Sequence, residues 1–466
     1  MSVIDVVTRN LVETRFESLP AKVVEVTKKQ ILETLAATVG GSTCSISGEI
    51  ERLVDLVKDW GGKKESTIVA FGGRVPAPNA AFMNGILCVR LDFDDTQVRG
   101  LNIHISRGIV PTACAIAERQ GGISGKEFLT AVALGHDLSF RLRKAGGNDM
   151  ESSFGMITNF FGAAAAAGKI LNLNAAQLNA ALGLTFHQLS GAQSSPGTAG
   201  AGASIKGLNN GIACKTGIAS ALLAERGFSG SLDFLEEYNK RNLYQTFFRG
   251  VYLLPALTTD LGKIFAGVYT SQKEFPCCHG QHTSIEATLA LIKENDIQAE
   301  DIVEVVLHIS PGDNNYLASP PERKQKPQNI IEAQFSLYWG VASALVYREA
   351  TIKNFTAEAL GDARIKEMVN KISTRPEAGL VNKEGFASAM VEIKTKNGRM
   401  YSRRLNYPFG SPDNPMSFAD VGAKFKQCCR YSAKPISEEN QDKVIQMVAD
   451  IEQVNDVGRI VRLLAS

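Results

Sequence analysis

The segment 91–96, Leu-Asp-Phe-Asp-Asp-Thr, and the histidine that follows it, His104, place three carboxylates, a hydroxyl and an imidazole in a short stretch of chain. If the segment is helical, Asp92 and Thr96 lie one turn apart on the same face, and Asp95 can join them there. A histidine beside such groups can exchange protons near neutral pH. Spacing alone favours another interpretation, in which the acids are solvated at a helix end and the histidine is an ordinary loop residue.

A second candidate group lies at 273–282, Lys-Glu-Phe-Pro-Cys-Cys-His-Gly-Gln-His. The segment holds four residues of metal-ligating type: Cys277, Cys278, His279 and His282. Three of them are consecutive, and adjacent side chains diverge, whereas zinc ligands are usually separated by several residues. The sequence therefore predicts no metal site, and these residues also fit a structural junction that buries its thiols.

The elements that must position these groups are mostly helical in the first half of the chain. A Ser-Gly-Lys-Glu capping box at 124–127 begins one helix, and Pro111 fits the first turn of another. The run 162–168, Gly-Ala-Ala-Ala-Ala-Ala-Gly, is small and apolar, so we expect it at a close contact between helices. The glycine-rich segment 191–211, which carries one cation, Lys206, is either a linker or a substrate-handling loop.

The second half of the chain has a mixed pattern. Residues 303–309 are predicted to form a strand, and two more strands flank Asn397-Gly398, a strong signal for a type I′ hairpin turn. Helical periodicity lies between them, at 331–346 and 357–372. This alternation is typical of an α+β module.

Helical periodicity returns after residue 408. We therefore predict a mainly α protein in which both chain ends, 1–269 and 409–466, form a large all-helical domain. A smaller α+β domain at 270–408 is inserted into it. A length of 466 residues also favours two domains over one simple core.

Composition excludes several classes of function. The chain is 44% hydrophobic and 21% charged with a formal net charge of +2, so it has no basic field for nucleic acid. No apolar run reaches membrane-spanning length and no signal peptide is visible, so we expect a cytoplasmic protein that does not bind a membrane. The eight cysteines form no Cys-x-x-Cys motif, which gives little support to an iron–sulfur cluster, and we predict no cofactor.

Several motifs along the chain together carry a family resemblance. They are Asn84-Gly85, Leu91-Asp-Phe-Asp-Asp-Thr96, His104-Ile-Ser106, Pro111-Thr-Ala113, the 162–168 run, the Lys206 loop, Phe275-Pro-Cys-Cys278, His282, Glu332-Ala-Gln-Phe-Ser336 and Asn414-Pro-Met-Ser417. In this order and spacing the chain resembles the MmgE/PrpD family, which includes 2-methylcitrate dehydratase, cis-aconitate decarboxylase and iminodisuccinate epimerase. The resemblance implies a large helical domain, a smaller α+β lid, an active site in the cleft between them, and a homodimer.

The resemblance also implies the chemistry, which is proton transfer at carbon next to a carboxylate. His104 would be the principal base or acid, with Asp92 orienting it or sharing its proton. Lys206 and Lys273 would hold the carboxylates of a small-molecule substrate, where fixed cations lower the barrier to proton removal. The remaining implied substrate-binding residues are Thr96, which would bind a substrate oxygen, and Cys278, His282 and Tyr316 on the lid side.

The sequence departs from the family pattern at informative places. Ile105 replaces the usual proline after the histidine, and extra residues lie between Thr96 and His104. The stretch 152–157 lacks the histidine of many members, so a catalytic or binding group is missing there. Cys278 stands where cis-aconitate decarboxylases have a histidine, which weighs against decarboxylation.

The leading hypothesis is a cofactor-independent hydro-lyase, most simply a dehydratase of a 2-methylcitrate-like hydroxy acid. The alternatives are an epimerase or isomerase of a carboxylate, which needs the same proton abstraction, and then a decarboxylase. A non-catalytic binding protein on the same fold is the alternative from another class, and the missing histidine favours it.

Overall fold

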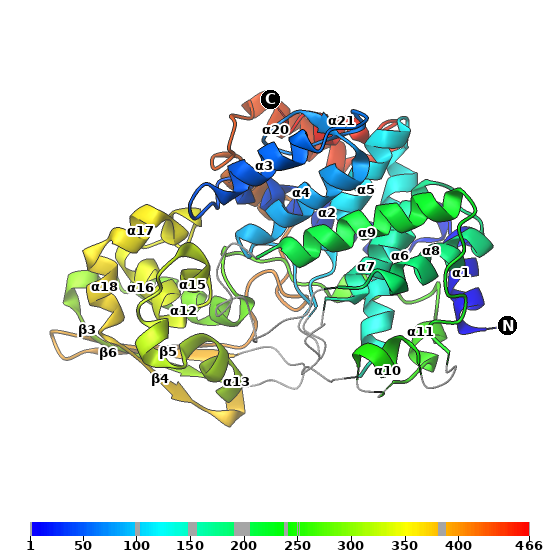
Figure 1. Ribbon diagram of the computed structural model, residues 1–466. Coiled ribbons are helices and arrows are strands. Elements are labelled where there is room, and N and C mark those ends of the chain that lie inside the picture. The colour runs from blue at the N-terminus through cyan, green and yellow to red at the C-terminus, as the bar shows by residue number, and fades with distance from the viewer. Residues whose placement is uncertain are drawn as a thin grey trace.

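The computed structural model describes residues 2–97, 103–147, 156–190, 206–236, 241–248, 250, 252–380 and 388–465. Helices dominate these residues, which confirms the prediction of a mainly α protein. Figure 1 shows a large group of helices on one side and a smaller group, built on a sheet, on the other.

The larger group is formed by the first part of the chain. Its helices are α1 (Val3–Glu13), α2 (Ala21–Gly41), α3 (Glu49–Asp59), α4 (Ala77–Arg90), α5 (Ser106–Gln120), α6 (Gly125–Ala145), α7 (Thr158–Ile170), α8 (Ala175–His187), α9 (Leu208–Glu225), α10 (Leu243–Phe247) and α11 (Pro255–Thr258). It is not all-helical as predicted, because β1 (Ser66–Thr67) and β2 (Arg74–Val75) form a short antiparallel ribbon.

Local signals begin these helices where the sequence predicts. The Ser124 side chain accepts the backbone N–H of Glu127, and the Glu127 carboxylate accepts the N–H of Ser124, so the predicted capping box is confirmed. The small residues of 162–168 are buried, and Gly162 of α7 faces Gly135 of α6. A Cβ on Gly162 would lie 2.7 Å from the Gly135 carbonyl oxygen, which confirms the predicted close helix–helix contact.

The position of Pro111 is a correction to the sequence analysis. Helix α5 begins at Ser106, so Pro111 lies inside the helix rather than in its first turn. A proline cannot donate to the carbonyl four residues earlier, which here belongs to Arg107. The side-chain amide of Asn210 donates to that carbonyl at 2.9 Å and also to Gly85 O at 2.8 Å, so the freed acceptor is satisfied from α9.

The last helices of the chain join the larger group. They are α19 (Phe418–Cys429), α20 (Glu438–Ala449) and α21 (Gly458–Arg462). Helix α19 packs against α2, and α21 packs against α5. In Figure 1 this red end of the chain lies at the top of the larger group, away from α1. The division of the chain into domains at 269/270 and 408/409 stays a prediction.

The smaller group contains a four-stranded sheet in the order β4-β3-β5-β6. Its strands are β3 (Ile302–Ile309), β4 (Ile372–Pro376), β5 (Ala389–Thr395) and β6 (Met400–Leu405). Strand β3 pairs with β4 in parallel and with β5 in antiparallel orientation, and it confirms the strand predicted at 303–309. The helices of this group are α12 (His282–Glu294), α13 (Pro311–Asp313), α14 (Pro321–Lys324), α15 (Ile330–Gln334), α16 (Leu337–Tyr347), α17 (Ala357–Gly361) and α18 (Ala363–Val369), with a π-helical turn, η7 (Asn314–Ala318).

Two local predictions in this group are wrong. The helical pattern at 357–372 ends at Val369, because Ile372 begins the edge strand β4. The β5–β6 hairpin does not use a type I′ turn, which needs positive φ at both central residues. Gly398 is at φ 82°, but Asn397 is not in that region, and Thr395 donates its N–H to Arg399 O. The loop is thus one residue longer and ends in a glycine bulge.

Candidate active site

The aspartate-rich segment is a turn and not a helix. Helix α4 ends at Arg90, and Asp92 has φ 53° in the left-handed region. Thr96 then exchanges backbone hydrogen bonds with Ser271, at 3.0 and 2.7 Å. The helix that would place Asp92 and Thr96 on one face is therefore absent, and the three aspartates turn their side chains toward different partners.

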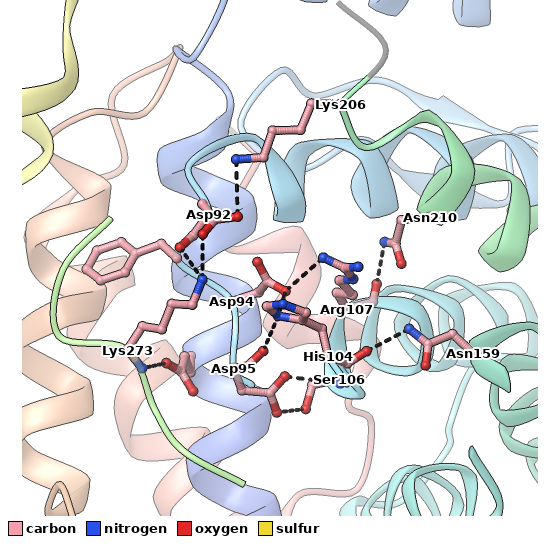
Figure 2. A network of polar contacts seen from close by, with 12 residues as sticks. Asp92, Asp94, Asp95, His104, Ser106, Arg107, Asn159, Lys206, Asn210 and Lys273 are labelled. Carbon is pink, nitrogen blue, oxygen red and sulfur yellow. Dashed lines mark hydrogen bonds and ion pairs between the residues drawn. The ribbon is translucent and has the colours of Figure 1, made fainter. Parts of the chain in front are cut away.

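Asp92 lies between two lysines. Its carboxylate is 2.7 Å from Lys273 Nζ and 3.3 Å from Lys206 Nζ, and Figure 2 shows the lysines reaching it from opposite sides. Burial by itself raises the pKa of Asp92, but the two lysines outweigh burial and hold that pKa well below its usual range. Asp92 is therefore a permanent anion at neutral pH.

The two lysines differ in their own surroundings. Burial lowers the pKa of Lys206, although Asp92 opposes that change, and its ammonium also donates to Gln334 Oε1 at 2.7 Å. For Lys273 the attraction of Asp92 outweighs burial, so its pKa is raised. Lys273 Nζ donates to the Asp92 carbonyl as well, at 2.7 Å, which fixes it to the turn.

His104 is held by other aspartates. Its Nδ1 is 2.7 Å from the carbonyl oxygen of Asp95 and 3.1 Å from Asp94 Oδ2. A carbonyl oxygen only accepts, so Nδ1 carries the proton and Nε2 is the basic nitrogen of the neutral ring. The prediction that Asp92 orients His104 is corrected, because Asp94 and the backbone of Asp95 make these contacts (Figure 2).

The charge on the His104 ring is set mainly by its burial. Burial lowers its pKa most, the guanidinium of Arg107 lowers it further, and the Asp94 carboxylate opposes both. A histidine whose pKa lies below 6.5 is neutral at pH 7, which is the form a base requires. The carbonyl of His104 accepts the amide of Asn159 at 2.7 Å, so the backbone beneath the ring is fixed from α7.

Asp94 and Asp95 have opposite electrostatic character. Burial raises the pKa of Asp94, but His104 and Arg107 outweigh it and keep that pKa below its usual range. Burial, with Glu33 nearby, raises the pKa of Asp95 to about 7, even though Ser106 hydrogen bonds to it. The Asp95 carboxylate accepts the Ser106 N–H at 3.2 Å and its hydroxyl, and so caps the start of α5.

Comparisons with known proteins place the chain in a family. Family models of the MmgE/PrpD N-terminal domain and the MmgE/PrpD C-terminal domain match residues 7–253 and 275–452. The chain belongs to the MmgE/PrpD family. This confirms the resemblance seen in the sequence motifs.

Members of the MmgE/PrpD family with curated names are similar to this chain over nearly its whole length. Human cis-aconitate decarboxylase is 24% identical over 96% of this chain and 91% of its own length. Mouse cis-aconitate decarboxylase is 24% identical over 94% and 88%, and the Aspergillus terreus protein of that name is 23% identical over 96% and 93%. These relatives are enzymes of the lyase type.

The other residues expected from the MmgE/PrpD resemblance lie at different places. Tyr316 packs edge-on against Phe335, with 5.9 Å between the ring centres. Lys206 Nζ lies 5.0 Å from the centre of the Phe335 ring, so Phe335 lies beside both Tyr316 and the Lys206 ammonium. Cys278 donates its backbone N–H to Gln334 O. Burial raises the pKa of its thiol to about 12, so the thiol is protonated at neutral pH.

Asp92, Lys206 and Lys273 form the lysine–aspartate group. Among the described contacts, none joins His282 or the Thr96 side chain to it. His282 is fully buried, stacks on His279 at 5.1 Å between ring centres and contacts the Cys277 carbonyl at 3.4 Å. Thr96 is buried in the bridge to Ser271. Their substrate-binding roles remain predictions.

Sequence reasoning missed several residues of the site. It gave no role to Asp94 and Gln334, which lie within the quoted family motifs, and it did not consider Arg107 and Asn159. A cation directly after the His104-Ile-Ser motif was the available signal for Arg107. Of the stretch 152–157 that lacks the family histidine, residues 152–155 lie outside the described residues.

No metal-binding arrangement is found in the described part of the chain. There, no group of three or more His, Cys, Asp or Glu side chains is placed to hold an ion. Likewise, no helix within the described ranges is both long and apolar enough to cross a membrane.

Proposed function

We propose that this protein is a cofactor-independent lyase that removes a proton from carbon next to a carboxylate of a small carboxylic acid. The finer assignment is a hydro-lyase, most simply a dehydratase of a 2-methylcitrate-like hydroxy acid. The observation that carries the proposal is one buried network, in which two lysines share Asp92 and the Nδ1 of His104 is held by the Asp95 carbonyl, which leaves Nε2 as the basic nitrogen.

The side chains divide the reaction between them. His104 Nε2 takes the substrate proton, and the electron pair of the broken C–H bond forms a carbon–carbon double bond as the C–O bond to the β-hydroxyl breaks. The departing hydroxide takes a proton from an acid and leaves as water. Lys206 and Lys273 stabilise the negative charge that gathers on the substrate carboxylate while the proton leaves.

Both parts of the chain supply this machinery. Asp92 and His104 come from the helical part, whereas Lys273 and the Gln334 partner of Lys206 come from residues 270–408. We propose that 270–408 acts as a lid over a substrate bound at their contact. Closure would exclude water, which strengthens the interaction of the lysines with a bound carboxylate.

Decarboxylation is the second candidate, because the similar curated proteins are named cis-aconitate decarboxylases. It would use the same lysines but would break a C–C bond and reprotonate the carbon. Cys278 in place of a histidine weighs against it. An epimerase would return the proton on the other face, and a binding protein would do none of these.

The test is incubation of the purified protein in D₂O with 2-methylcitrate, citrate, cis-aconitate and simpler hydroxy acids, followed by NMR and mass spectrometry. Loss of water supports dehydration, loss of carbon dioxide supports decarboxylation, and deuterium uptake without mass loss supports epimerisation. The activity should vanish in His104→Gln. The His187→Gln variant is the matched control, since His187 bonds Ser231 outside the site.

Failure of every acid to exchange or react, together with a rise in thermal stability on binding one of them, would favour the binding protein and overturn the lyase proposal.

A further inference from the structure

Asp94 and Arg107 form a pair beside the His104 ring that the proposed reaction does not yet use. Asp94 Oδ2 lies 3.1 Å from His104 Nδ1 and 3.4 Å from Arg107 Nη1. The exposed fraction of each side chain is small, at 17% for His104, 11% for Arg107 and 0% for Asp94. One carboxylate oxygen thus joins the imidazole to a guanidinium away from bulk water.

The geometry of this pair is poor for a stabilising ion pair. Arg107 Nε is buried without a hydrogen-bond partner in the described part of the chain, and so is Asp94 Oδ1. A buried ion pair normally needs good geometry and satisfied hydrogen bonds to repay the loss of water. Here a single 3.4 Å contact joins the two charges, while Asn210 anchors only the Arg107 backbone.

We propose that Asp94 and Arg107 are positioning residues with opposite effects on the protonated form of the base His104. This inference rests on the proposed function. Asp94 stabilises the imidazolium that forms when Nε2 accepts the substrate proton. Arg107 limits that stabilisation, so the ring is neutral before the reaction and can give the proton up afterwards.

The physical basis is the sign of each charge near the ring. A carboxylate favours a protonated imidazole and a guanidinium disfavours it, and burial makes both effects larger than they are in water. The other groups that face His104 are the Asp95 carbonyl on its own segment, Asp92 on the turn, Lys273 before η5 (His279–Gln281), and His279 in that turn. They remain unchanged in variants of the pair.

The experiment is an NMR titration of the histidine ring signals in the full-length protein without substrate. The chain has six histidines, and loss of one signal in His104→Gln assigns that residue. In Asp94→Asn the midpoint of the His104 titration should fall, and in Arg107→Met it should rise. Arg107→Lys keeps the charge and should restore the wild-type midpoint.

The matched control is Asp137→Asn, which also neutralises a buried carboxylate paired with an arginine, at 2.6 Å from Arg141, but away from the ring. It should leave the His104 titration unchanged. Midpoints that move in the same direction in Asp94→Asn and Arg107→Met, or that do not move, would overturn the proposal. If Asp94→Asn does not fold, a His104 midpoint that fails to rise in Arg107→Met, or that rises equally in Arg107→Lys, still overturns the proposal.

Turnover separates this proposal from the proposed function. With a substrate from the D₂O experiment, Asp94→Asn should lower kcat roughly 10- to 100-fold with little change in KM, because it acts on the transition state through His104. If the wild type turns over no acid, the lyase proposal fails while the NMR titration still tests the pair. Opposite midpoint shifts without any effect on kcat would limit the pair to setting the charge of the free ring and overturn its role in the reaction.

Discussion

Asp92 holds together the charges of the site at the scale of single residues. Its φ of 53° is unusual for a residue with a side chain and costs about 1–3 kcal/mol. The contacts of its carboxylate with Lys206 and Lys273 and of its carbonyl with Lys273 keep it in that conformation. The strained turn thus brings a fixed anion between two buried lysines, and that anion favours the charged form of each.

Removal of one lysine should weaken the binding of carboxylate substrates. In Lys206→Met we expect KM to rise roughly 10- to 100-fold, because a charged hydrogen bond contributes about 1.5–3 kcal/mol. The measurement is steady-state kinetics with a substrate from the D₂O experiment. Lys215→Met is the control, since Lys215 also lies over an aromatic ring, that of Trp60 at 4.7 Å, but outside the site. An unchanged KM in Lys206→Met would remove Lys206 from the binding site.

The pH dependence of activity should report the neutral His104. Burial and Arg107 lower the pKa of His104 from its ordinary value of 6.5, so the ring is still unprotonated when the pH falls to 6.5. As pH falls, kcat/KM should hold through 6.5 and decline only when the pH passes the lowered pKa. The check is a kcat/KM profile corrected for ionisation of the substrate. A decline that begins above pH 6.5 would mean that another group is the base.

At the scale of elements, the start of α5 decides how the site is assembled. Asp95 caps the helix at Ser106, and Asn210 satisfies the carbonyl of Arg107 that Pro111 leaves free. The helix can therefore begin five residues before its proline. This earlier start carries Arg107 on the first turn and places its guanidinium beside Asp94.

The contact between α6 and α7 leaves no room for a larger residue. Gly162→Ala should lower the free energy of unfolding by about 1–3 kcal/mol, because the new Cβ would lie 2.7 Å from a backbone oxygen and 2.8 Å from Ile109 Cδ1. Urea denaturation measures the change. Gly361→Ala is the control, since nothing lies within 4 Å of its added Cβ. Equal stability of the two variants would contradict the tight packing.

At the scale of the whole molecule, Lys424 of α19 links segments from four parts of the chain. Its ammonium is 2.6 Å from Glu33 of α2, 2.8 Å from the Phe93 carbonyl and 2.7 Å from the Lys273 carbonyl. Helix α19 therefore supports the backbone on both sides of the lysine–aspartate group. The site depends in this way on residues more than 300 positions away in sequence, since Phe93 and Lys424 are 331 apart.

Removal of Lys424 alone should lower the free energy of unfolding more than removal of both Lys424 and the charge of Glu33. In Lys424→Met the buried Glu33, whose pKa burial already raises, loses the ammonium that stabilises its charged form, so we expect the free energy of unfolding to fall by about 3–5 kcal/mol. The double variant Glu33→Gln/Lys424→Met should recover part of that loss. Chemical denaturation of the three proteins is the measurement, and a double variant no more stable than the single one would contradict the account.

The oligomeric state is a further prediction at this scale. The family resemblance implies a homodimer, and sedimentation in solution should therefore give twice the chain mass of 50.2 kDa. A monomer over a wide range of protein concentration would contradict it.

The sequence by itself determined the features that depend on local rules or on the family pattern. The capping box at Ser124, the strand β3 and the small-residue contact at Gly162 follow from spacing and side-chain size. The family motifs also indicated the participants of the site, and the structure brings three of them, Asp92, Lys206 and Lys273, into direct contact.

Only the tertiary structure decided how the charged groups are paired. The direction of each aspartate depends on the backbone of the turn after α4, and that turn is set by Lys273, 181 residues away, and by the bridge from Thr96 to Ser271. Local spacing cannot report such distant contacts. For that reason the sequence alone did not show whether this segment is a helix or a turn, and Asp92 was assigned to His104 although Asp94 holds the ring.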